Sequence, residues 1–152
     1  MARHESYILR ATIIFWFIFW WYILYSMFWP PIVFKYNQLP LPVDKRVVKR
    51  GDLLTITGDY CKYIGNKADV TFSLERKLTE DQKKRHIKDI NLTFDEIKNS
   101  NLPMGCHVTS WNILIPYELT KTDWRLIKSI HVKVNHFRTI DLEYTSEWFT
   151  VI

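Results

Sequence analysis

The chain has 152 residues, 16% of them aromatic, and a formal net charge of +5. This length corresponds to one ordinary domain, and no repeat or low-complexity stretch suggests a second. The net charge is mild, and the basic residues form no dense stripe interleaved with aromatic residues, which excludes a typical nucleic-acid-binding protein. We therefore expect no nucleic-acid partner.

The first predicted element is an apolar segment near the N-terminus. Residues 11–29 contain no charged side chain, and as a helix they would be about 28 Å long, close to the ~30 Å hydrocarbon core of a bilayer. The remaining chain is too small to bury a helix that is apolar on every side. A cleaved signal peptide is also disfavoured, because no small-residue cleavage site follows and Pro30 and Pro31 end the segment. We predict a transmembrane anchor over residues 8–29 after a short tail, residues 1–7.

Aromatic side chains are concentrated in this anchor. Phe17, Trp21 and Tyr25 recur every four residues on one helix face, which fits packing against another helix as well as contact with lipid. Tyr and Trp near the ends of a span also serve as interfacial anchors. The residues that we assign to the membrane anchor are Phe15, Trp16, Phe17, Trp20, Trp21, Tyr22, Tyr25 and Trp29.

A proline-containing strap over residues 30–45 follows the anchor. Pro40 and Pro42 alternate with apolar residues, a pattern typical of extended or polyproline-like chain rather than helix. The strap either lays one edge strand along the folded domain or spaces this domain from the bilayer.

The rest of the chain, residues 46–152, alternates between apolar and polar residues with a period of two, which is typical of strands with one buried face. We count about seven strands at short spacing. Two antiparallel sheets packed as an immunoglobulin-like sandwich would bury their apolar faces, so this all-β architecture is the predicted fold. The residues predicted to face the core are Val70, Phe72, Leu74, Ile90, Leu92, Phe94, Ile130, Val132, Val134, Ile140, Leu142, Tyr144 and Trp148.

One short helix is predicted within this domain. Thr79 precedes Gln82 by three residues, a capping-box pattern that indicates one or two helical turns over residues 80–86. The charges from Glu75 to His86 are of both signs, which favours a solvated hairpin tip over a site for nucleic acid or anionic lipid.

Cys61 and Cys106 are the two cysteines of the chain. A disulfide between them is the favoured interpretation, while two separate buried thiols or a metal site remain alternatives. In the predicted strand that contains Cys61, strict alternation from Ile56 places Tyr60, rather than Cys61, on the core face. We therefore expect either a bulge at Gly58 that switches the face or a bridge at the edge of the sandwich.

The orientation of the anchor depends on this disulfide. Positive charges are nearly balanced across the predicted span, so the positive-inside rule does not decide the topology. A disulfide forms in an oxidising compartment. We therefore predict a single-pass membrane protein with a cytoplasmic N-terminus and an extracytoplasmic β domain, which would be periplasmic in a Gram-negative bacterium.

The search for catalytic residues finds no constellation. The sequence has no G-x-S-x-G, no H-E-x-x-H and no glycine-rich phosphate loop. His131 and Asp141 lie on neighbouring predicted strands and would suit acid/base chemistry, but the polar outer faces of two paired strands explain them more simply. We predict no enzyme activity, no cofactor and no bound metal.

Three segments carry a resemblance to known proteins: VVKRGDLLTITGDYCKY at 47–63, NLPMGCH at 101–107 and VKVNHFRTIDLEYTSEWFTV at 132–151. They resemble small bacteriophage-encoded, membrane-anchored β-sandwich proteins of unknown function, most specifically in the D-Y-C-K-Y and G-C-H segments with their paired cysteines. The resemblance implies a phage origin and an anchored domain, but no reaction. The sequence departs from this pattern at residues 118–124, where such proteins tend to have a Pro-Gly-Tyr-type turn.

Two functional classes fit these features. The first is a membrane-tethered, non-catalytic interaction protein at the host envelope, which binds a protein partner through loops or an exposed edge strand. The second is a structural or accessory subunit of a membrane assembly, which contacts its partners through the aromatic helix. Membrane lipids are a predicted partner in both classes, and the oligomeric state stays open.

Overall fold

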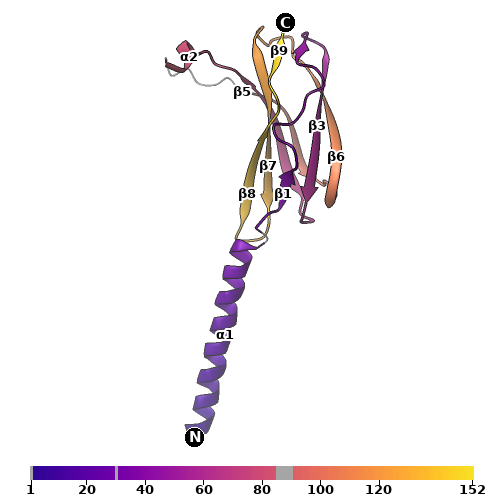
Figure 1. Ribbon diagram of the computed structural model, residues 1–152. Helices are drawn as coiled ribbons and strands as arrows, with labels where there is room; N and C mark the ends of the chain where they lie inside the picture. The colour runs from indigo at the N-terminus through magenta and orange to yellow at the C-terminus, as the bar shows by residue number, and fades with distance from the viewer. Residues whose placement is uncertain (1, 30, 85–90) are drawn as a thin grey trace.

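The computed structural model describes residues 2–29, 31–84 and 91–152 (Figure 1). It consists of one long N-terminal helix and a mostly β domain, whose strands run lengthwise in the direction of the helix axis (Figure 1). In chain order the elements are α1 (Ala2–Phe28), β1 (Phe34–Tyr36), β2 (Val47–Val48), β3 (Leu53–Lys62), β4 (Ala68–Arg76), α2 (Glu80–Lys84), β5 (Asn91–Ser100), β6 (Gly105–Leu114), β7 (Asp123–Lys133), β8 (Thr139–Thr145) and β9 (Phe149–Val151).

Helix α1 projects from one end of the domain (Figure 1). Its segment Tyr7–Phe28 is long and apolar enough to cross a bilayer, and none of it is buried against the rest of the protein. The hydroxyl groups of Thr12 and Ser26 donate hydrogen bonds to the carbonyls of Ile8 and Tyr22, at 2.9 and 2.8 Å. In hydrocarbon, where water is absent, these two hydroxyl groups would therefore keep their hydrogen-bond partners.

The strands of the domain form two sheets. One sheet has the order β1-β3-β6, and the other has the order β2-β9-β7-β4-β5, with β8 paired to β7. The pairs are antiparallel except for the short parallel pair β2–β9. In the described part of the chain there are nine strands rather than about seven, because β1 and β2 are short elements without a strong alternating pattern. The expectation of an N-terminal helix followed by a mostly β domain is confirmed, whereas the immunoglobulin-like arrangement stays a prediction.

One hydrophobic core joins both sheets. Leu54 and Ile56 of β3 and Leu126 of β7 are completely buried in it. The predicted core positions are confirmed on β4 and on most of β7, where Val70, Phe72, Leu74, Ile130 and Val132 are all buried. On β8, Ile140, Leu142 and Tyr144 are partly buried against the same core, as is Val134 beyond the end of β7.

Two parts of the predicted core differ in the structure. Phe149, rather than Trp148, is the buried residue near the C-terminus. The strand conformation is interrupted between β8 and β9, and the alternation starts again at β9. Leu92 and Phe94 of β5 are 39% and 37% exposed. They lie next to the inward residues of β4, but the opposite, three-stranded sheet ends at β6 and does not cover β5. Ile90 lies outside the described residues.

The strap forms an edge strand. β1 pairs with β3, and both Phe34 and Tyr36 are buried. Further along, Leu41 is completely buried, donates to the carbonyl of Thr145 and accepts from the amide of Glu147, both at 2.9 Å. The chain from Val33 onward therefore belongs to the folded domain.

The short helix α2 has the predicted capping box. The Thr79 amide donates to Gln82 Oε1 at 3.0 Å, and the Gln82 amide donates to Thr79 Oγ1 at 3.3 Å. The helix covers Glu80–Lys84 and stands apart from the two sheets, near the end of the domain away from α1 (Figure 1). His86 of the predicted span lies outside the described residues.

Candidate functional site

The eight residues assigned to the membrane anchor lie on α1 or, for Trp29, one residue beyond it, and all of them are exposed. The rings of Phe17 and Trp21 stack with a centroid distance of 6.4 Å, and those of Tyr25 and Trp29 stack at 6.0 Å. The predicted aromatic stripe therefore consists of two stacked pairs, one turn apart along the exposed helix. Its exposure suits both contact with lipid and contact with another helix.

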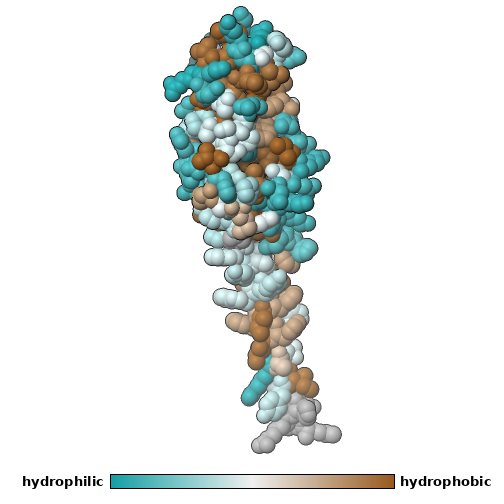
Figure 2. All heavy atoms as spheres, turned by 90° about the vertical axis from the view of Figure 1, so that its right-hand side faces the viewer, coloured by the Kyte–Doolittle hydropathy of each residue, from teal (hydrophilic) through white to brown (hydrophobic). Residues whose placement is uncertain are grey.

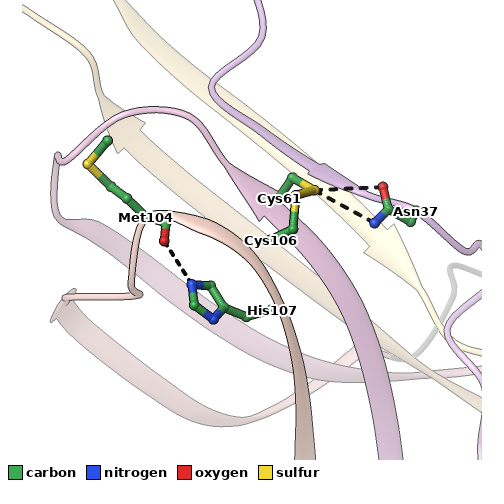
Figure 3. The surroundings of a disulfide bond; sticks show 5 residues. All are labelled: Asn37, Cys61, Met104, Cys106 and His107. Atoms are coloured by element: carbon green, nitrogen blue, oxygen red, sulfur yellow. Dashed lines mark hydrogen bonds between the residues drawn. A yellow bond between two sulfur atoms is a disulfide. The ribbon is translucent and has the colours of Figure 1, made fainter.

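The predicted disulfide joins Cys61 and Cys106, which are register partners on β3 and β6 (Figure 3). The pairing of these two strands continues without a shift past Gly58, so the predicted bulge is wrong. Tyr60 faces the core as expected, and the bridge lies on the other face of the sheet, where it joins β3 to the edge strand β6. A disulfide of this kind is typical of an oxidising compartment.

Gly58 has a different role from the expected one. A Cβ atom at this position would lie 2.5 Å from a ring carbon of Tyr36 and 2.8 Å from one of Trp111. Only glycine lets these two rings pack directly against the backbone of β3. The close approach of the rings to this strand is what creates the aromatic cluster described below.

Figure 3 also shows the residues around the disulfide. Asn37 Nδ2 donates to Cys61 Sγ at 3.7 Å, and His107 Nε2 lies 2.7 Å from the carbonyl oxygen of Met104. His107 lies on the opposite side of β6 from Cys106, and both sulfur atoms are used in the disulfide. The cysteines and the neighbouring histidine are therefore not arranged to share a metal ion.

An open cleft lies between β5 and β6, the edge strands of the two sheets. Its volume is about 280 Å³. Phe94 and Ile97 of β5 form one wall, Trp111 of β6 forms the other, and Phe72 lies in the same lining. Because the three-stranded sheet ends at β6, the apolar inner side of β5 remains uncovered. Figure 2, which views the molecule from the side of β6, shows apolar residues reaching the domain surface among hydrophilic ones.

A lysine is buried beneath this cleft. Lys128 of β7 is 1% exposed, and its Nζ donates to the hydroxyl of Tyr36 at 2.8 Å. The Nζ lies 3.8 Å from the ring centroid of Trp111 and 5.4 Å from that of Phe72, the two rings that also line the cleft. A lysine among ring faces is stabilised by cation–π attraction, which partly offsets the loss of water.

Burial changes the protonation of this cluster. Desolvation lowers the pKa of Lys128 from 10.5 to about 7, since the charged form loses its hydration. The same cause raises the pKa of Tyr36 and, less strongly, that of Tyr144. The pKa of this amine thus lies near neutral pH, so the charge held between the rings of Trp111 and Phe72 depends on pH.

Sequence reasoning missed Lys128. The alternation that places Ile130 and Val132 inward also places Lys128 inward, two residues earlier on the same strand. The pattern thus contained the signal, but the residues predicted inward on this strand began at Ile130, because a lysine is almost never fully buried.

His131 and Asp141 are direct register partners on β7 and β8, and their side chains are in close contact. They lie on the outer face, where the exposed fractions of the two side chains are 57% and 80%. Thr71, Ser129 and Glu143 line the same shallow surface. This arrangement matches the polar outer faces of paired strands that the sequence favoured.

No family model matches the chain, and no curated protein matches its sequence. Solved structures do resemble it. A sporulation control protein from Bacillus subtilis, Spo0M, matches with a TM-score of 0.47 and 12% identity, covering 79% of this chain and 49% of its own. A cellulose-active polysaccharide monooxygenase from M. thermophila matches with a TM-score of 0.50 and 11% identity, covering 71% and 54%. A Niemann-Pick type C2 protein from the Japanese carpenter ant has a TM-score of 0.38 and 8% identity, covering 76% and 100%.

These similarities concern the fold alone, since the identities are very low. The chain spans about half the length of the first two of these proteins. The function must therefore be argued from the chain's own surfaces.

Proposed function

We propose that this protein is a single-pass membrane protein whose β domain is a non-catalytic, immunoglobulin-like interaction module. The N-terminus would be cytoplasmic and the domain extracytoplasmic, where the disulfide is stable. The resemblance of its sequence to phage-encoded anchored proteins supports a role at a host cell envelope. The observation that carries the proposal is the combination of an exposed apolar helix of bilayer length with an open cleft on the domain.

The cleft fits an extended protein segment. Along its free edge β6 has no partner strand among the described residues, so its backbone groups can pair with an added strand. A strand in that place would also extend the three-stranded sheet over Leu92, Phe94 and Ile97, which are now 37–43% exposed. We therefore expect a partner segment with apolar side chains at alternate positions, since every second residue would face β5.

Site-specific photo-crosslinking in native membranes tests this proposal. A photoreactive phenylalanine analogue at Ile97 reports on the cleft, and the same analogue at Leu53 reports on a similarly exposed site, 55% exposed, outside it. We expect a defined protein adduct from position 97 and at least about tenfold less from position 53. In the same membranes, Ile97→Asp should abolish the interaction and Leu53→Asp should preserve it. Equal adducts or equal losses at the two positions would refute the cleft as the binding site.

A second candidate function rests on the aromatic face of α1. The stacked rings of Phe17 and Trp21 border a notch of about 290 Å³ on the helix surface, which a side chain of a neighbouring helix would fill. The chain would then be an accessory subunit of a membrane assembly. Protein adducts from a photoreactive residue at Trp21, in the absence of adducts from the cleft, would favour this function.

A further inference from the structure

The end of the domain that adjoins α1 is built from four segments, which we call the helix-proximal end: residues 31–33, 63–67, 101–104 and 134–138 (Figure 1). Asn66 Nδ2 in the second segment donates to the carbonyl of Val134 in the fourth at 2.7 Å, and to that of Lys133 at the end of β7 at 2.6 Å. The buried Lys62 Nζ donates to the carbonyl of Leu102 at 2.8 Å, which joins the end of β3 to the third segment. The Tyr63 amide donates to the carbonyl of Val33 at 3.0 Å, which joins the first segment to the second. The four segments therefore form one connected surface.

This surface is tied directly to the helix. Asn135 Nδ2 donates to the carbonyl of Ser26 at 2.6 Å, so the loop between β7 and β8 reaches the last turn of α1. The aromatic pair Tyr25 and Trp29 lies at the same level of the helix. Tyr and Trp at the end of a transmembrane helix mark the headgroup region of the bilayer. A domain held at this point has its helix-proximal end at headgroup depth.

Each of the four segments exposes one large apolar side chain. Ile32 and Tyr63 are both 52% exposed, Met104 is 58% exposed and Phe137 is 57% exposed. Apolar side chains at loop tips are removed from water when they insert into the boundary between headgroups and acyl chains, which is favourable. One such residue alone needs no explanation, but four on one connected surface beside an apolar helix indicate a common environment.

The charge of this end has a single sign. None of the four segments contains Asp or Glu, whereas exposed Lys67 lies in one of them and exposed Lys133 lies directly beside another. The opposite end of the domain differs, because its loops carry both signs. The exposed charges there include Lys49, Asp52, Glu118 and Lys121. Lysines next to a bilayer surface attract lipid phosphates, and anionic lipids strengthen this attraction.

We propose that the helix-proximal end is a lipid-binding surface that lies on the headgroup layer of the bilayer crossed by α1. This proposal rests on the membrane anchoring proposed above. The apolar tips enter the interface and the lysines contact phosphate groups, so the domain stands upright on the membrane instead of swinging on a flexible stem. The cleft between β5 and β6 then opens to the side, away from the lipid.

Full-length protein in phospholipid nanodiscs tests this surface. A photoreactive phenylalanine analogue is placed at Phe137, and the control is the same analogue at Tyr117, an aromatic residue of the opposite end that is 71% exposed. After irradiation, mass spectrometry measures lipid adducts. We expect at least about tenfold more lipid adduct at 137 than at 117, and a similar excess at Met104. Equal yields at all three positions, or adducts at 137 and 104 to protein only, would overturn the proposal.

A charge test separates lipid phosphate in general from anionic lipid. The double variant Lys67→Glu with Lys133→Glu should lower the adduct yield at 137 at least about threefold in nanodiscs with phosphatidylglycerol, and less in pure phosphatidylcholine. Lys49→Glu with Lys121→Glu is the matched control at the opposite end and should change nothing. Equal effects of both pairs would refute the role of charge. A chain recovered outside the nanodiscs would refute the anchoring itself, which is a different result from an incorporated chain without lipid adducts.

Discussion

The replacement Lys128→Met tests the central feature of the core. Methionine has a similar length and removes the charge without opening a large cavity. Folding buries the Lys128 amine among the rings of Tyr36, Phe72 and Trp111. We expect the free energy of unfolding of the wild-type protein to depend strongly on pH, and we expect this dependence to be lost in the variant.

The sign and size of the effect follow from the two pKa values of Lys128. In the unfolded chain this pKa is 10.5, and in the folded protein burial lowers it to about 7. Between these pH values the unfolded chain binds one more proton than the folded protein, so stability rises with pH. Each pKa unit is worth about 1.4 kcal/mol, which gives about 4 kcal/mol between pH 7 and pH 10. Cation–π attraction favours the charged form by up to about 2 kcal/mol, so we expect a rise of roughly 2–4 kcal/mol.

Urea denaturation of the full chain in nonionic detergent micelles, followed by the far-ultraviolet circular dichroism of the strands, measures this dependence. Below pH 7 the variant should be more stable than the wild type by roughly 1–4 kcal/mol, and the difference should shrink as the pH approaches 10. Lys133→Met, an exposed lysine on the same strand, is the control and should follow the wild type. If the free energy of unfolding depends on pH in the same way for Lys128→Met and the wild type, burial of the Lys128 amine is not the cause of this dependence.

Two further predictions concern β3. Replacing both Cys61 and Cys106 with serine should lower the free energy of unfolding by about 4 kcal/mol, because the bridge closes a loop with a sequence separation of 45; reductant should affect only the wild type. Gly58→Ala should cost roughly 1–3 kcal/mol, because its Cβ would meet the two rings over β3, whereas Gly65→Ala, with one ordinary contact, should be nearly neutral in the same urea titration. Equal effects of the two glycine substitutions would refute this packing.

The alternating pattern predicted where strands lie, but it did not predict which strands or sheets pack against them. Val70, Phe72 and Leu74 are buried as expected, because alternation is a local property of a strand that has one face on a core. The same pattern on β5 did not lead to burial of Leu92 and Phe94. Whether an inward residue is covered depends on the width of the opposite sheet, which a single strand does not encode.

Which strands pair with one another could not be predicted from the sequence. β2 pairs with β9 across about one hundred residues of chain, and this parallel contact follows from long-range packing that has no local signature. Gly58 shows the same limit, since its role depends on two rings from β1 and β6 rather than on its own strand. The capping box of α2, by contrast, involves only Thr79 and Gln82 and was predicted correctly.

The lengthwise course of the strands along the axis of α1 has a geometric consequence for self-association (Figure 1). Antiparallel pairing of β6 with β6 of a second copy needs a twofold axis perpendicular to the strands, which would turn that copy upside down. Two copies anchored in the same membrane by α1 point the same way, so a twofold axis relating them lies along the membrane normal. Such neighbours can bring their β6 edges together only in parallel. An antiparallel partner strand must therefore come from a protein of different sequence or from a copy anchored in a facing membrane.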